Sequence, residues 1–152
     1  MRNVIPFPEH EQEEYPRVEP GAYALRFTHW ETKRRFNTGK VSVWFEVVSY
    51  GEAFGVRLAR HYNAKHLIGK LGKKGGFYAG KCSDLAREFY TVMELAGEPV
   101  GKFRPDRLPL HLLGSHVVVG VVRDVKHDSK RKPIPQALQY SVVDELKGIK
   151  PP

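Results

Sequence analysis

Aromatic and cationic side chains are interleaved in residues 30–45, WETKRRFNTGKVSVWF. Trp30, Phe36 and Trp44 carry large apolar rings, which proteins usually bury or cover. Between them stand Lys33 and further cations, which repel one another unless an anion lies nearby. Either the rings face the interior and the charges solvate a loop, or this stretch binds an anionic, aromatic polymer. Single-stranded nucleic acid presents both features, because its bases stack on aromatic rings and its phosphates attract cations.

A second candidate is the glycine-rich stretch 75–82, GGFYAGKC, which is close to the phosphate-binding pattern GxxxxGK[ST]. Lys81 would then contact the β- and γ-phosphates of a nucleotide. Cys82 stands where a hydroxyl should hold Mg²⁺, and a thiol is a poor ligand for that hard cation. The residues before it also make a poor strand. We therefore expect a glycine-rich basic loop, either flexible or in contact with a nucleic-acid backbone.

A third pattern is Asp124 followed later by Glu145-Leu-Lys147, which is similar to the D…ExK pattern of metal-dependent nucleases. There two carboxylates hold Mg²⁺ and the lysine orients or activates water. Solvated charges at strand ends are the plainer interpretation, and nuclease activity stays as the alternative function. The seven histidines and the single Cys82 show no zinc spacing, so we expect no catalytic residue, metal ligand or cofactor.

Length and composition favour one compact domain. The chain has 152 residues, of which 41% are hydrophobic, enough for a core. One cysteine cannot form an internal disulfide, and no secretion signal or bilayer-length apolar run is present, so we expect a cytoplasmic protein that contacts no membrane.

The positive charge is concentrated in one part of the chain. The formal net charge is +8, and residues 21–82 contain twelve basic and three acidic residues. Residues 1–20 contain two basic and five acidic residues together with four prolines. We interpret residues 1–20 as an extended acidic arm, residues 21–147 as the folded domain and residues 148–152 as a short tail. A concentrated positive field favours a polyanionic partner.

Periodicity predicts a mainly β fold with one helix. Apolar residues alternate with polar ones in three segments, and the stretch after Ser83 has helical spacing that ends at Gly97 and Pro99. The predicted elements are strands at 23–28, 41–48 and 54–59, a helix at 84–96, and strands at 116–126 and 137–146. Three strands, a helix and two strands is the element order of the OB-fold, a five-stranded Greek-key barrel with the helix between strands 3 and 4.

The alternation also predicts which side chains face outward. If odd-numbered residues of the first two strands fill the barrel, Trp30 and Trp44 lie on the outer face, where OB-folds bind oligonucleotides. Two basic loops, around 33–36 and 130–132, are expected to flank that face. The candidate nucleic-acid-binding residues are Arg26, Trp30, Lys33, Arg34, Arg35, Phe36, Lys40, Trp44, Arg57, Arg60, Tyr62, Lys73, Lys74, Lys130, Arg131 and Lys132.

The strand sequences GAYALRF and VSVWFEV, the basic loops and the element order together resemble OB-fold single-stranded DNA-binding proteins, in particular the divergent ones of phages and other mobile elements. The resemblance covers about residues 21–146. It implies binding of single-stranded DNA with little sequence preference, in replication or recombination, and it implies homo-oligomers and replication or recombination proteins as further partners. Many members end in an acidic tail with a terminal Pro-Phe, whereas this chain ends KGIKPP and has its acidic segment at the other end.

The sequence therefore predicts a non-enzymatic protein that binds single-stranded nucleic acid, DNA before RNA. Two alternatives stay open: the nuclease, and an accessory module whose aromatic face binds another protein. The acidic arm is a candidate competitor that folds over the basic face. Its deletion would then tighten binding.

Overall fold

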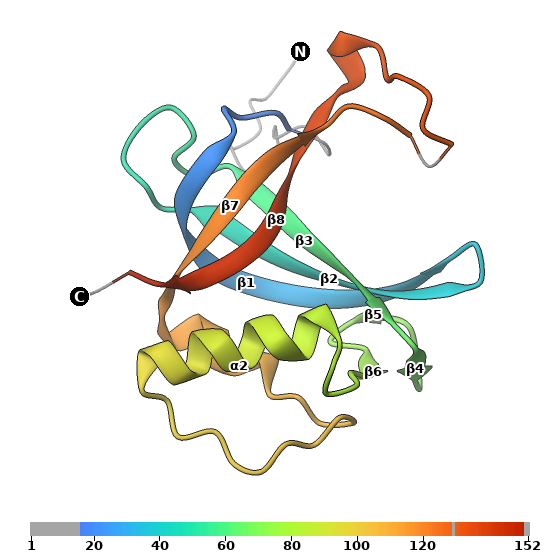
Figure 1. Cartoon of the computed structure of the whole chain (residues 1–152), viewed down its shortest axis with the longest axis vertical. Helices are drawn as coiled ribbons and strands as arrows, with labels where there is room; N and C mark the ends of the chain where they lie inside the picture. Colours follow the sequence, from blue (N-terminus) through green and yellow to red (C-terminus); the bar gives the residue numbers. More distant parts are fainter. Residues whose placement is uncertain (1–15, 129, 151–152) are drawn as a thin grey trace, which may run out of the picture.

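The computed structural model describes residues 16–128 and 130–150, which form a mainly β structure with an antiparallel sheet and one α-helix (Figure 1). Of the predicted acidic arm, residues 1–15 lie outside the described residues. The strands are β1 (Gly21–Arg35), β2 (Thr38–Val47), β3 (Arg57–Ala64), β4 (His66–Ile68), β5 (Gly72–Lys73), β6 (Gly76–Tyr78), β7 (Val117–Val125) and β8 (Tyr140–Ile149); the helices are α2 (Asp84–Ala96) and the 3₁₀ segments η1 (Leu110–Ser115) and η2 (Gln136–Leu138).

The five long strands follow the order β3-β2-β1-β7-β8, and every neighbouring pair is antiparallel. Because β7 returns after a long connection to pair with β1, the first four of them have Greek-key order. No backbone ladder joins β3 to β8 within the described residues, so the sheet curls without closing into a barrel (Figure 1). The short β5 pairs with β1, and β4 with β6.

The core lies inside this curled sheet and is covered at one end by α2. Val41, Val43, Phe45 and Val47 are fully buried, as the alternation along β2 predicts. The predicted helix is confirmed: the Ser83 side chain accepts a hydrogen bond from the backbone of Ala86, and Gly97 ends the helix at φ 67°. The buried face of α2 packs Leu85, Phe89, Val92 and Met93 against the sheet.

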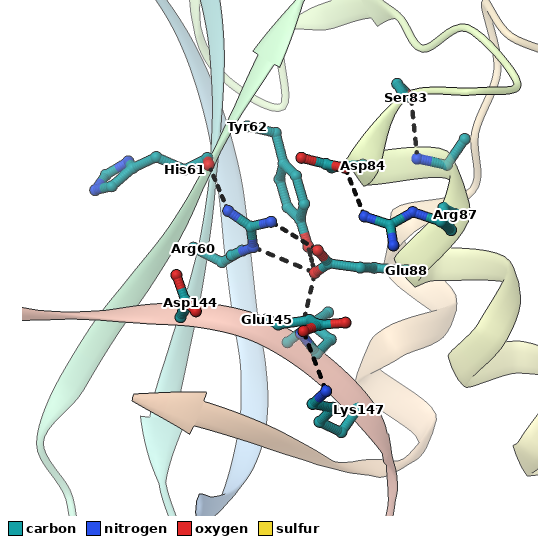
Figure 2. A network of polar contacts seen from close by, with 12 residues as sticks. Arg60, His61, Tyr62, Ser83, Asp84, Arg87, Glu88, Asp144, Glu145 and Lys147 are labelled. Atoms are coloured by element: carbon teal, nitrogen blue, oxygen red, sulfur yellow. Dashed lines mark hydrogen bonds and ion pairs between the residues drawn. The ribbon is translucent and has the colours of Figure 1, made fainter. Parts of the chain in front are cut away.

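A buried carboxylate links β3 and β8, the two ends of the strand order, which no backbone ladder joins in the described residues (Figure 2). Glu88 of α2 is 2% exposed and accepts hydrogen bonds from Arg60 (Nε 3.2 Å, Nη2 2.6 Å) and from the Tyr62 hydroxyl (2.8 Å), both on β3. The backbone N–H of Leu146 on β8 donates to the same carboxylate at 3.0 Å. Burial, and then the charge of Glu88, raises the pKa of the Tyr62 hydroxyl well above its usual value. Side-chain contacts therefore hold β3 and β8 together where backbone pairing is missing.

The first hairpin is longer than its sequence pattern predicts. The sequence pattern predicts a loop around 33–36, but β1 continues through Arg35, and the turn consists of Phe36 and Asn37. Both turn residues have positive φ, 51° and 64°, which is typical of a two-residue hairpin turn that matches the twist of its strands. The hairpin therefore extends beyond the end of the core.

Other predicted strand boundaries are also wrong. The third strand begins at Arg57 instead of residue 54, because the chain turns through 51–55 and Phe54 is 63% exposed. Leu138, expected in the last strand, lies in η2 and is 67% exposed. The last strand ends at Ile149 instead of residue 146.

Candidate nucleic-acid interface

The outer face of β1, β2 and β3 carries a cluster of cations at the hairpin end. Residues directly opposite in an antiparallel pair point to the same face, and the register places Lys33 opposite Lys40 and Lys40 opposite Asn63. Arg35 follows Lys33 on the same face, whereas Arg34 points to the other. Farther along the same face lie Ser42, His61, Trp44, His29 and Arg57.

A β-bulge in β1 places the two tryptophans on opposite faces of the sheet. The register of β1 against β2 shifts between Phe27 and His29, so that Trp30 lies opposite the buried Val43 and points inward. Its ring stacks on Phe27 at 6.5 Å between centroids, and its Nε1 donates to the carbonyl oxygen of Gly75 at 2.9 Å. The prediction that Trp30 shares the outer face with Trp44 is therefore wrong, because one extra residue in the strand reverses the alternation.

Trp44 does lie on the outer face, where it stacks on a histidine. The centroids of the Trp44 and His29 rings are 6.2 Å apart and their planes differ by 9°. The Trp44 Nε1 donates to the carboxylate of Glu31 at 3.3 Å, which fixes the orientation of the indole. Burial lowers the pKa of the His29 imidazole; the charge of Glu31 opposes this effect, and the charges of Lys73 on β5, opposite Glu31, and of Arg57 on β3 add to it. The paired rings are therefore flanked by cations.

Between the hairpin and the segment before β8 lies a groove of about 650 Å³. A smaller hollow of about 90 Å³ adjoins it, and Lys33, His61 and Tyr140 line both. We call the first the basic groove; its lining residues are Lys33, Arg35, Phe36, Thr38, Lys40, His61, His127, Asp128, Ile134 and Tyr140. The small hollow is lined by Pro16, Glu31, Lys33, Trp44, Arg57, Leu58, Ala59, His61, Tyr140, Ser141 and Val142.

The cations of the basic groove lie close enough to repel one another. The pKa of Lys40 lies below its usual value because of burial first, and then because of the charges of Arg35 and Lys33. Burial, followed by the charges of Lys33, Lys40 and two arginines, lowers the pKa of the His61 imidazole to about 4, so it is neutral at pH 7. An anion in the groove would relieve this repulsion.

His61 is held at the junction of the groove and the small hollow. Its Nδ1 lies 2.7 Å from the hydroxyl oxygen of the fully buried Ser42. Figure 2 shows its ring pointing away from Arg60 and Glu88, although all three residues are close along the chain or in space. The sequence analysis assigns no role to the histidines beyond the absence of zinc spacing, but alternation after Arg57 predicts that His61 lies on the outer face. Alternation along the first strand does not predict that His29 lies on the outer face, because the β-bulge before it reverses the alternation.

Phe36 stands at the tip of the hairpin in an unfavourable backbone conformation. It is 81% exposed, and its φ of 51° is one that residues other than Gly and Asn rarely adopt. The Arg35 guanidinium lies 5.7 Å from its ring centroid. The exposed ring makes Phe36 a candidate contact residue, because this backbone conformation is not offset by burial of the side chain.

We expect Phe36→Asn to raise the free energy of unfolding by about 0.5–1 kcal/mol, because Asn tolerates a left-handed turn. If Phe36 stacks on a base, the same variant weakens binding of oligo-dT by about tenfold. Chemical denaturation and fluorescence anisotropy measure the two effects. Tyr50→Asn is the control, since Tyr50 is fully exposed but lies outside the groove. Unchanged affinity in Phe36→Asn would exclude stacking by this ring.

Several predicted contact residues lie elsewhere. Tyr62 is 2% exposed, so its ring cannot serve as a stacking surface, and Arg60 is held by Glu88. Arg26 is in an ion pair with Glu46 at the far end of the outer face. Lys74 directly follows β5, and its backbone N–H donates to the carbonyl oxygen of Trp30 on β1. Three cations, Lys130, Arg131 and Lys132, are exposed in the segment before β8 and do not line the basic groove.

The glycine-rich stretch 75–82 packs against β1 and does not form a phosphate loop. A Cβ at residue 75 would lie 2.0 Å from the Thr32 hydroxyl oxygen, so glycine is required by this close approach. β6 lies within the motif instead of before it, and the Ser83 cap, not Lys81, begins the helix. Cys82 is a free, exposed thiol.

The structure does not bring the nuclease-like residues together. Asp124 lies opposite Ser141, four residues from Glu145 along β8, a separation of roughly 13 Å. The Asp124 carboxylate binds Arg17 at 3.1 Å, while Glu145 pairs with Lys147 at 3.2 Å. In the described part of the chain, no three His, Cys, Asp or Glu side chains gather in a way that could hold a metal ion.

Comparisons with protein families, curated proteins and solved structures found no match for this chain. Among the described helices, none has the length and apolar character needed to cross a bilayer.

Proposed function

We propose that this protein binds single-stranded nucleic acid, DNA before RNA, along the outer face of β1, β2 and β3. The observation that carries the proposal is the basic groove, in which Lys33, Arg35 and Lys40 converge beside an exposed ring, Phe36. Phosphates bind these cations, and bases stack on Phe36 and on Trp44. The expected affinity depends steeply on salt and little on base sequence.

We also propose that the fold is an open OB-type barrel. The Greek-key order of the strands and the position of α2 between β3 and β7 support this. In such barrels the loops between strands 1 and 2 and between strands 4 and 5 flank the binding face. The β1–β2 turn and the segment between β7 and β8, through His127 and Ile134, flank the basic groove in the same way.

The direction of the two tryptophans provides a sharp test. Single-stranded DNA should quench the fluorescence of Trp44 on the outer face and leave that of the inward Trp30 nearly unchanged. We therefore expect Trp30→Phe to retain the quenching during titration with oligo-dT, and Trp44→Phe to lose most of it and bind several-fold more weakly.

Thermal unfolding of both variants shows whether each is folded, and anisotropy of labelled oligo-dT measures affinity independently of tryptophan. Equal quenching in the two variants, or quenching carried by Trp30 alone, would contradict the proposed face. Absence of binding by either method would contradict the function itself. In that case the aromatic face should be tested as a surface for a protein partner.

A further inference from the structure

The side of α2 that faces away from the sheet carries a basic residue near its start and an acidic residue near its end. Arg87 and Glu94 are both exposed, whereas the opposite side of the helix is buried against the sheet. Two turns of helix separate them, so they lie nearly in one line along the axis, about 10 Å apart. The half-buried Tyr90 and the exposed Thr91 lie between them. This side of α2 therefore has opposite charges at its two ends.

A groove of about 620 Å³ follows this side of the helix, and we call it the helix groove. Its lining includes Phe103, in the connection that runs along α2 on the side away from the sheet (Figure 1). The rings of Tyr90 and Phe103 meet edge to face, with 5.5 Å between their centroids. The helix groove therefore has an apolar middle between two charges. Exposed apolar surface with a polar rim is typical of protein interaction sites.

The order of the charges is complementary to itself when the helix is reversed. If a second copy packs antiparallel to α2, with the two-fold axis between Tyr90 and Thr91, Arg87 of each copy faces Glu94 of the other. A parallel pair would instead place like charges opposite each other. Arg87 also contacts Asp84 at 2.5 Å, but both side chains are more than half exposed, so this pair contributes little and leaves other guanidinium donors available.

We propose that the protein forms a homodimer in which the α2 helices of two copies pack antiparallel across their helix grooves. The contact is isologous, because each copy contributes the same surface. It does not depend on the proposed function: the basic groove and the helix groove share no lining residue, so both basic grooves stay accessible in the dimer. One short helix per copy buries less area than a standard interface, so we expect a dissociation constant in the micromolar range.

Charge reversal tests the pairing, because each single variant should fail to dimerise and their mixture should succeed. Arg87→Glu places two carboxylates opposite each other at both ends of the pair, and Glu94→Arg places two guanidinium groups there. Each variant alone should dimerise at least about tenfold more weakly than the wild type. In an equimolar mixture every carboxylate again faces a guanidinium, so the mixed dimer should match the wild type within about threefold. Sedimentation velocity over a concentration series measures these equilibria.

Lys150→Glu and Glu52→Arg are the matched controls, because they change the net charge equally at exposed positions outside the helix groove. Each control, alone or mixed with the other, should dimerise like the wild type. The inference is overturned if the wild type stays monomeric up to millimolar concentration, or if the mixture of Arg87→Glu and Glu94→Arg stays monomeric. Dimerisation of either single variant as tight as that of the wild type would also overturn it.

Cross-linking tests the antiparallel orientation. Thr91 of each copy lies beside the two-fold axis, so Thr91→Cys with Cys82→Ser should form a disulfide-linked dimer in air with a copper catalyst. The free, exposed Cys82 of the two copies would lie about 25 Å apart at opposite ends of the pair, so the wild type should not cross-link. Glu52→Cys with Cys82→Ser is the control for random collision. Cross-linking through Cys82, or equal cross-linking at residues 91 and 52, would contradict antiparallel packing.

Discussion

Replacing Glu88 by alanine is expected to lower the free energy of unfolding by about 3–5 kcal/mol, the usual cost of removing one partner of a buried ion pair. The substitution leaves three groups without their acceptor: the guanidinium of Arg60, the hydroxyl of Tyr62 and the backbone N–H of Leu146. These groups belong to β3 and β8, which no backbone ladder joins in the described part of the chain. Chemical denaturation monitored by circular dichroism measures the change.

Glu94→Ala is the matched control, because Glu94 lies on the same helix with its side chain exposed. It should change the free energy of unfolding by less than about 0.5 kcal/mol. Glu88→Gln should also lower the free energy of unfolding, because the glutamine amide nitrogen is a donor and would face the donors of Arg60, Tyr62 or Leu146. If Glu88→Ala costs no more than Glu94→Ala, packing alone holds β3 against β8, and the account of the open sheet is wrong.

Charge reversal in the basic groove, Lys33→Glu with Lys40→Glu, is expected to weaken binding of oligo-dT by more than about 100-fold at low salt. The two side chains lie directly opposite each other on β1 and β2, so the variant replaces two neighbouring positive charges by two neighbouring negative charges. Stability should therefore change little. Loss of two phosphate contacts should also reduce the slope of log affinity against log salt by about 1.4.

Lys102→Glu with Lys150→Glu is the control, since both lysines are exposed and line neither the basic groove nor the small hollow. The control changes the net charge by the same amount, so it measures the effect of the general field of the protein. Anisotropy of labelled oligo-dT at several salt concentrations compares the two. Equal weakening by both variants would show that binding follows net charge and that the groove has no special role.

The sequence predicts the elements of this fold better than the direction of single side chains. Alternation along 41–47 and the capping of the helix at Ser83 and Gly97 depend on neighbouring residues only, and both are found in the structure. The bulge after Phe27 depends on how β1 meets β2, and no local residue type announces it. It exchanges the expected faces of His29 and Trp30.

The polar link at Glu88 was partly visible in the sequence. Helical spacing places Glu88 on the same face as Leu85 and Val92, where a carboxylate must be buried and therefore paired. The sequence predicts its partners, Arg60 and Tyr62, as nucleic-acid contacts, because basic and aromatic side chains can either bind nucleic acid or pair with a buried carboxylate. Only tertiary structure distinguishes the two uses.

We propose that the basic groove binds single-stranded nucleic acid. The most direct test is titration of the full-length wild-type protein with labelled oligo-dT at a series of salt concentrations, with Mg²⁺ present and the oligonucleotide checked afterwards for cleavage. We predict saturable binding that weakens steeply as salt rises and leaves the oligonucleotide intact. Lack of binding at low salt, or binding insensitive to salt, would contradict the claim.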